Sequence, residues 1–175
     1  MEPSADGLGE VIADEDAIRA DVARLAAQIS ADYAGKQLHL IGVLKGSTLF
    51  LADLMRALSI PVTVDFISVV PYGQVTASGV VRIRKDLDEP IEGRDALVVE
   101  GICASGLTLS YLLRNFQTRN PASLKTCALL AKRRDRPPAV QPDYVGREIN
   151  DVFVVGYGLD WDERYRNLPY IARLA

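Results

Sequence analysis

Short apolar runs alternate along this chain with longer segments whose apolar residues recur at helical spacing. The clearest helical stripe runs from Ile18 to Ile29 and is followed by Gly35, so a helix is predicted from about Asp14 onwards. Further helices are expected after Ser47 and after Gly106. These segments alternate with short, β-branched, apolar runs of the kind that form buried strands: 38–44, 62–70, 96–99 and 124–130.

Weaker patterns complete the picture of an α/β domain. Alternation over 80–84 predicts a strand with one solvent-facing side, and short strands are expected near 144–145 and 153–157, with a last apolar piece at 170–174. Strands alternating with helices in this order predict a mostly parallel central sheet flanked by helices. Ligands of such sheets bind at the carboxyl ends of the strands.

Composition narrows the class of protein. At 175 residues with 49% hydrophobic residues, the chain is interpreted as a single domain over 1–175, in which 1–13 begins as a loose N-terminal arm. A formal net charge of -3 argues against bulk electrostatic binding of nucleic acid. No signal peptide or membrane-spanning stretch is evident, and Cys103 and Cys127 are interpreted as reduced core thiols, so a cytoplasmic location without membrane attachment is expected.

The most informative stretch is 95–113. An apolar strand over 96–99 leads into the small residues 101–106, and leucines at helical spacing follow. A strand, a small-residue loop and a helix together present backbone N–H groups to an anion, usually a phosphate, and the hydroxyls of Ser105 and Thr108 can add donors. Because small residues also make ordinary connections between strand and helix, both interpretations stay open from this loop alone.

A second loop of the same kind follows the strand at 38–44. Lys45 and Gly46 lie where that strand turns into the next helix. The cation and the N–H groups of the first helical turn would point the same way, which suits an anion, although this loop too can be an ordinary connection.

Several separated segments together resemble the bacterial hypoxanthine (hypoxanthine-guanine) phosphoribosyltransferases, of the type I phosphoribosyltransferase family. The resemblance extends from the first helix to the C-terminus, and its individual segments are each short. They are 44–47, 64–66, 72–73, 78–81, 85–88, 106–113, 143–146, 153–160 and 165–169.

The resemblance implies a fold, a reaction and partners. The fold is that of the type I phosphoribosyltransferases, with a small hood formed by the C-terminal region. In the reaction, phosphoribosyl pyrophosphate and hypoxanthine or guanine give IMP or GMP and pyrophosphate, with Mg²⁺ as cofactor. The family's habit also implies a homodimer or homotetramer.

The resemblance also assigns roles by position. The pyrophosphate loop would be formed by Leu44, Lys45, Gly46 and Ser47. The 5′-phosphate loop would be formed by Ala104, Ser105, Gly106, Leu107 and Thr108. The resemblance also implies a purine site formed by Lys132, Phe153 and Val154 and a mobile loop that contains Tyr72 and Gly73. The catalytic positions are Glu100, which would meet the ribose hydroxyls, Ala104, and Arg166, which would lie near the pyrophosphate. The metal-binding positions are Glu100 and Asp160, which would hold Mg²⁺ together.

The chain departs from the family at the end of the central strand. Gly101 replaces the second of two adjacent acids, and Ala104 replaces a third acid that is expected to handle the proton at N7 of the purine. Acid–base help of this kind is typically worth about 10² to 10⁴ in rate. Pro71 also replaces the serine before the tyrosine of the mobile loop. An attenuated enzyme is therefore expected.

Two alternatives remain open from the sequence. The first is a catalytically weak nucleotide-binding or regulatory relative that keeps the phosphate and purine sites. The second is an RNA-binding regulator on the same fold, which would need a basic patch, and the sequence offers only the cluster Arg133, Arg134 and Arg136.

Overall fold

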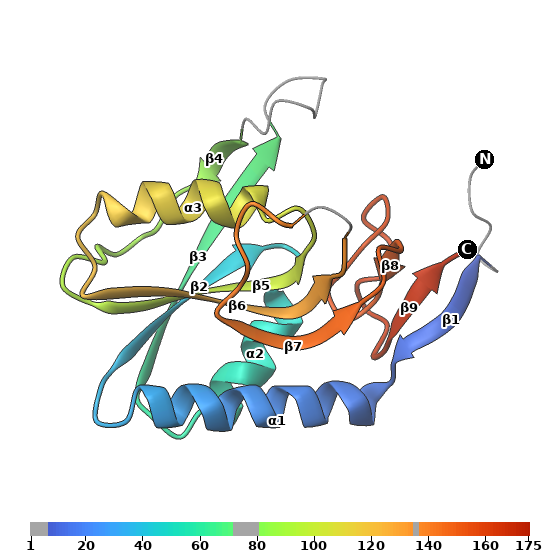
Figure 1. Ribbon diagram of the computed structural model, residues 1–175, viewed down its shortest axis with the longest axis horizontal. Coiled ribbons are helices and arrows are strands. Elements are labelled where there is room, and N and C mark those ends of the chain that lie inside the picture. Colours follow the sequence, from blue (N-terminus) through green and yellow to red (C-terminus); the bar gives the residue numbers. More distant parts are fainter. Residues whose placement is uncertain (1–6, 72–80, 135–136) are drawn as a thin grey trace.

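A computed structural model describes residues 7–71, 81–134 and 137–175 of the chain. Two sheets organise it: a six-stranded main sheet and a three-stranded hood (Figure 1). The main sheet has the strand order β4-β3-β2-β5-β6-β7, and all neighbours are parallel except β3 and β4. Its strands are β2 (Leu38–Leu44), β3 (Val62–Pro71), β4 (Val81–Lys85), β5 (Asp95–Cys103), β6 (Ser123–Lys132) and β7 (Tyr144–Ile149).

Helices cover both faces of the main sheet. Helices α1 (Glu15–Asp32) and α2 (Thr48–Ala57) lie on one face, and α3 (Leu107–Gln117) lies on the other (Figure 1). The predicted stripe from Ile18 to Ile29 is buried against the first face, and the carboxylate of Asp14 caps α1 by accepting from the Ala17 N–H at 2.8 Å. The two buried cysteines are both free thiols, as expected.

Strand β5 is longer than the apolar run that predicts it. The predicted strand ends at Val99, but β5 continues to Cys103 because its backbone stays paired with β6, with Ile102 opposite Leu130 and Cys103 opposite Ala131. The polar Glu100 and the small Gly101 interrupt the hydrophobic pattern without interrupting the ladder. Glu100 is thereby placed inside the strand and not in the loop after it.

The hood joins both ends of the described chain. Strand β9 (Ile171–Leu174) pairs antiparallel with β8 (Val154–Val155) on one side and with β1 (Leu8–Ala13) on the other. Strand β1 thus occupies residues 8–13 of the segment 1–13 that was expected to begin as a loose arm. Its partner lies at the other end of the sequence, so no local pattern indicates the pairing.

Strand β8 is shorter than the expected 153–157. Gly156 and Tyr157 have left-handed backbone, with φ of 101° and 49°, which ends the strand. A Cβ atom at Gly156 would lie 2.0 Å from the carbonyl oxygen of Tyr170, so glycine is required at this close approach. The turn directs the following segment back toward the main sheet.

Candidate active site

The ends of β2 and β5 and the loop after β8 meet at the carboxyl edge of the main sheet. A Cβ atom at Gly101 would lie 2.7 Å from the carbonyl oxygen of Gly46, and a Cβ atom at Gly158 would lie 2.6 Å from the same oxygen. The Gly46 carbonyl is thus enclosed between two glycines. A larger residue at 101, including an acid, would require this loop to shift.

In the loop 44–47 the Lys45 side chain is exposed, whereas the Ser47 hydroxyl is buried. It begins with a cis peptide bond between Leu44 and Lys45. The Ser47 hydroxyl is fully buried and donates to the Val43 carbonyl at 2.8 Å, so it fastens the start of α2 and does not face a ligand. The charged group of the loop is therefore the ammonium of Lys45, which is 61% exposed.

Three charged residues of the loop between β8 and β9 form a chain of ion pairs that ends at Lys45. Glu163 pairs with Lys45 at 2.8 Å, and Arg166 pairs with Asp160 at 2.8 Å and with Glu163 at 3.4 Å. Arg166 also donates to the Gly158 carbonyl at 2.7 Å. The predicted residues Lys45, Asp160 and Arg166 therefore belong to one ionic cluster.

The loop 104–108 carries no charged side chain, so the groups it can offer to an anion are mainly backbone N–H groups. Gly106 has a φ of 70° and precedes α3, whose first turn contains Leu107 and Thr108. The Ser105 carbonyl accepts from the Ala139 N–H at 2.8 Å, and a Cβ atom at Gly106 would lie 2.6 Å from the Val140 carbonyl oxygen. The segment 139–140 thus supports the loop from behind, and the N-terminus of α3 offers N–H groups to an anion.

Glu100 lies on β5, close to both loops. Burial raises the pKa of its carboxyl to about 8, which favours the neutral form when no cation is near. A cation placed beside it would favour the charged form.

The carboxylates at this edge suit magnesium only together with a substrate. Within the described residues, no three His, Cys, Asp or Glu side chains are grouped to hold a metal ion. Mg²⁺ is usually held by one or two carboxylates, waters and substrate phosphates, so the pair Glu100 and Asp160 is a donor set that fits. Leu159 approaches the Cβ position of Gly101 within 3.1 Å, which brings the segment next to Asp160 against the strand that carries Glu100.

The expected purine residues lie at the end of β6 and the start of β8. The ammonium of Lys132 pairs with Asp151 at 3.2 Å, and Arg134 pairs with the other oxygen of Asp151 at 3.2 Å. Phe153 is 51% exposed and can therefore offer its ring to a planar ligand, while Val154 is buried and pairs with Arg173 in the hood. Tyr72 and Gly73 of the expected mobile loop lie outside the described residues.

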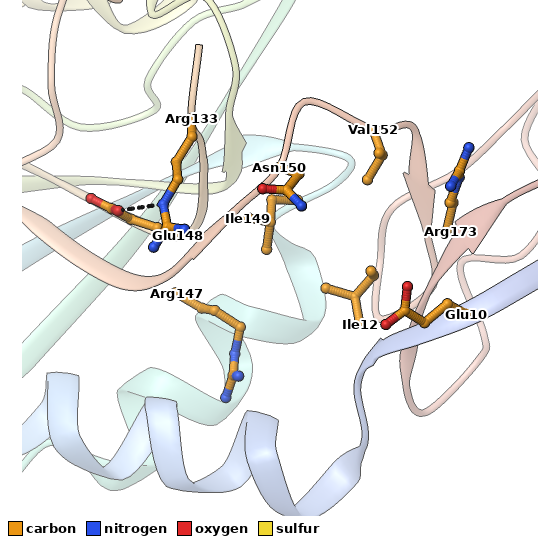
Figure 2. Close-up of a pocket in the computed structure, with 9 residues that line it drawn as sticks. All are labelled: Glu10, Ile12, Arg133, Arg147, Glu148, Ile149, Asn150, Val152 and Arg173. Carbon is orange, nitrogen blue, oxygen red and sulfur yellow. Dashed lines mark hydrogen bonds and ion pairs between the residues drawn. The ribbon is translucent and has the colours of Figure 1, made fainter.

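Two cavities border this region and differ in their lining. One of about 390 Å³ is lined by Ala104 and Lys132 together with Arg133, Arg134 and Glu148, among others. The other, of about 330 Å³, lies between the hood and β7 (Figure 2). None of the predicted site residues lines it, and its Arg133 is paired with Glu148 at 2.9 Å.

Sequence reasoning missed two carboxylates at this edge. Asp151 and Glu163 hold the cations Lys132 and Lys45 that were assigned to substrate. Each lies close in sequence to an assigned residue, Phe153 or Arg166. The sequence signal that could have found them is therefore a carboxylate a few residues away from a position to which a role had been assigned.

Comparison with known proteins identifies the family. The family model of the phosphoribosyl transferase domain matches residues 10–162 of this chain. A hypoxanthine-guanine phosphoribosyltransferase of Mycobacterium avium is 51% identical over 164 residues, covering 90% of this chain and 81% of the relative. The enzyme of the same name from Bacillus subtilis is 46% identical over 166 residues, covering 94% and 92%.

A solved structure agrees with these relatives. The crystal structure of a hypoxanthine-guanine phosphoribosyltransferase from Bacillus anthracis, with a HEPES molecule in its active site, superposes with a TM-score of 0.92 at 43% identity, covering 96% of this chain and 99% of the other. The chain belongs to the hypoxanthine-guanine phosphoribosyltransferase family. The expected fold class and the resemblance are thereby confirmed.

Proposed function

We propose that the protein is a purine-salvage enzyme that transfers the 5-phosphoribosyl group of phosphoribosyl pyrophosphate to hypoxanthine or guanine, giving IMP or GMP and pyrophosphate. The observation that carries the proposal is that the loops 44–47 and 104–108, whose groups suit anions, and Lys132 lie at the carboxyl ends of neighbouring parallel strands, in a chain of this family. The substrate has a 5′-phosphate and a pyrophosphate, so it needs two such loops.

Each role follows from the chemistry of the group. The loop 104–108 binds the 5′-phosphate, while Lys45 and Arg166 bind the leaving pyrophosphate and offset its growing negative charge. Lys132 donates to the 6-oxo group of the base, and Phe153 stacks on the ring. When bound, Mg²⁺ neutralises pyrophosphate oxygens, and Glu100 and Asp160 are the residues that would hold it.

We further propose that turnover is attenuated. No carboxylate stands at position 104 to take the proton from the purine nitrogen, because the residue is alanine. Positioning and charge are retained, so the reaction proceeds more slowly and is not abolished. The second candidate, a nucleotide-binding relative with negligible turnover, is favoured by the same alanine.

The deciding experiment is a steady-state assay of hypoxanthine, guanine and xanthine with phosphoribosyl pyrophosphate and Mg²⁺, accompanied by calorimetric titration with IMP. Product formation with at least one 6-oxopurine supports the enzyme. IMP binding without any product identifies the nucleotide-binding relative. If IMP caused neither heat nor a thermal shift at millimolar concentration, the assignment of the 104–108 loop would be wrong.

The preference of the enzyme for one purine over another tests the proposed role of Lys132 separately. Lysine can only donate, so 6-oxopurines are expected to be preferred over adenine by about tenfold or more, the cost of a buried polar mismatch. Lys132→Met should remove the preference, whereas Lys125→Met, on the same strand but near Tyr144, should keep it. Adenine used as well as hypoxanthine by the unmodified protein would contradict the role of Lys132.

We also propose a cytoplasmic homodimer or homotetramer. None of the helices within 7–71, 81–134 and 137–175 has the length and apolar character to cross a bilayer. Leu49, Met55 and Val64 expose 37–38% of their surface on α2 and β3, which suits contact between copies. Sedimentation or light scattering at micromolar concentration measures the state, and a monomer would contradict this part of the proposal.

A further inference from the structure

The carboxylate of Glu163 lies between the two cations that the proposed function assigns to pyrophosphate. One of its oxygens is 2.8 Å from the Lys45 ammonium and 3.4 Å from the Arg166 guanidinium. Lys45 comes from the loop after β2, and Arg166 comes from the loop before β9. A single carboxylate oxygen thus joins two cations of separate elements, as an oxygen of a bound phosphate would.

The backbone around Glu163 is held in an unfavourable conformation. Asp162, Glu163 and Tyr165 have φ angles of 52°, 61° and 75°, which residues with side chains adopt rarely and at a cost. The loop is fixed by the Glu163 N–H, which donates to Asp160 at 2.9 Å, and by paired backbone bonds between Trp161 and Arg164. These bonds direct Glu163 toward Lys45.

Arg166 keeps other partners if Glu163 withdraws. Its guanidinium also contacts Asp160 at 2.8 Å and the Gly158 carbonyl at 2.7 Å, and its Nε is buried without a partner. The Arg166 side chain therefore stays at this edge of the site without Glu163. By contrast, Glu163 is the one carboxylate paired with Lys45 within the described residues.

We propose that Glu163 is an internal competitor of pyrophosphate: in the ligand-free protein it occupies Lys45 and Arg166, and it must withdraw before a pyrophosphate group binds. The proposal rests on the proposed function, because that function assigns the two cations. Glu163 touches neither the base nor the sugar in this role. It sets the affinity for the pyrophosphate group and helps that product leave by taking back its cations.

The expected size of the effect is modest. Lys45 and Glu163 expose 61% and 63% of their side chains, and exposed ion pairs are weak. Removing the negative charge also removes its repulsion of the highly charged ligand. Glu163→Gln is therefore expected to tighten pyrophosphate binding by about two- to tenfold.

The test is calorimetric titration of the full chain with inorganic pyrophosphate, at one fixed magnesium concentration. The variant Glu163→Gln is compared with Asp162→Asn, which removes the same charge from the neighbouring residue. Asp162 is 79% exposed and pairs with Arg164 at 3.9 Å, and it forms no ion pair with Lys45 or Arg166, both of which are described residues. Only Glu163→Gln should bind pyrophosphate more tightly.

A second titration with IMP separates competition from a change of structure. IMP lacks the pyrophosphate group, so its affinity should be the same in all three proteins. Equal or weaker pyrophosphate binding by Glu163→Gln would overturn the proposal, and so would an equal gain in Asp162→Asn. If the unmodified protein bound IMP but no pyrophosphate, the assignment of Lys45 and Arg166 would fail first, which is a different result.

Discussion

The loops 44–47 and 104–108 both connect a parallel strand to a helix, but they offer an anion different groups. Around the first, the available groups are the cations Lys45 and Arg166, which are paired with Glu163 and Asp160. Around the second, the donors are backbone N–H groups before α3, supported by the segment 139–140. Under the proposed roles, the first loop exchanges internal ion pairs for a ligand, whereas the second offers backbone N–H groups and has no ion pair to exchange.

The difference between the loops gives each a separate weakness. A site made of long charged side chains responds to salt and to competing carboxylates. A site made of backbone responds to changes in backbone conformation and to nearby charge. We expect substitutions to have the largest effects on the two loops, a change of pH a smaller effect, and a change of salt concentration the smallest.

The largest effect is expected for Ala104→Asp, which adds a carboxylate to the uncharged loop. If the attenuation arises from this alanine, the rate of purine phosphoribosylation should rise by about 10- to 10³-fold, which reaches below the usual range for acid–base help because Gly101 stays unchanged. The opposing effect is repulsion of the nucleotide phosphate. Rate and IMP affinity are therefore measured on the same variant, and affinity lost without a gain in rate would refute the repair.

Two glycine substitutions should affect one loop each. Gly106→Ala places a Cβ atom 2.6 Å from Val140 at a φ of 70°, so IMP binding should weaken by about 10- to 100-fold, given a strain of about 1–3 kcal/mol, while pyrophosphate binding stays. Gly158→Ala, with φ 93° and a contact of 2.6 Å to Gly46, should show the reverse pattern. Gly93→Ala is the control, because its φ is 68° but no atom lies within 4 Å. Equal loss of both ligands in both variants would show that the loops are not independent.

Glu100 tests whether the strand leading to 104–108 is uncharged before ligands bind. Its pKa is about 8 in the folded protein against an ordinary value of 4.5, so between these pH values the folded state keeps a proton that the unfolded chain has lost. Stability contributed by this group is full below pH 4.5 and is lost as pH rises toward 8. Relative to Glu100→Gln, the unfolding free energy should fall by roughly 2–4 kcal/mol across that window. Urea unfolding at several pH values measures it, and a pH-independent difference would mean that Glu100 is ionised throughout.

Salt should give the smallest effect. Raising KCl from about 50 to 500 mM should weaken pyrophosphate binding by a few fold more than IMP binding, because Lys45 and Arg166 are screened while the N–H groups before α3 keep their fixed dipoles. Calorimetry at three salt concentrations is sufficient. Equal salt dependence of the two ligands would remove the distinction between a charged and a backbone site.

The sequence predicted the strands and helices around both loops better than the partners of their charged side chains. The strand 38–44 is confirmed with the same bounds, and the strand, loop and helix over 95–113 are confirmed with a longer strand. These elements depend on local hydrophobic period and small residues, which a single sequence shows directly. The partners of Lys45 and Lys132 depend on which distant segments meet, and no local pattern gives this.

Two further features show the same limit. Strand β1 was missed because its partner β9 lies at the opposite end of the chain. The contact of Gly101 with Gly46 was also invisible, although it explains why a side chain at 101 would need the other loop to move. Glycine at 101 was seen only as the loss of an acid, whereas the structure gives it a packing role as well.

The central place of β9 in the hood has a consequence for the order of synthesis. Within the described residues, β1 and β8 each pair with β9 and not with each other. The six strands of the main sheet are all available once Ile149 has been made, but β1 waits for residues 171–174. On a ribosome, the main sheet with both loops can therefore assemble first, and the segment carrying Asp160, Glu163 and Arg166 is fixed last. We expect the nascent protein to complete the proposed 5′-phosphate site before the proposed pyrophosphate site.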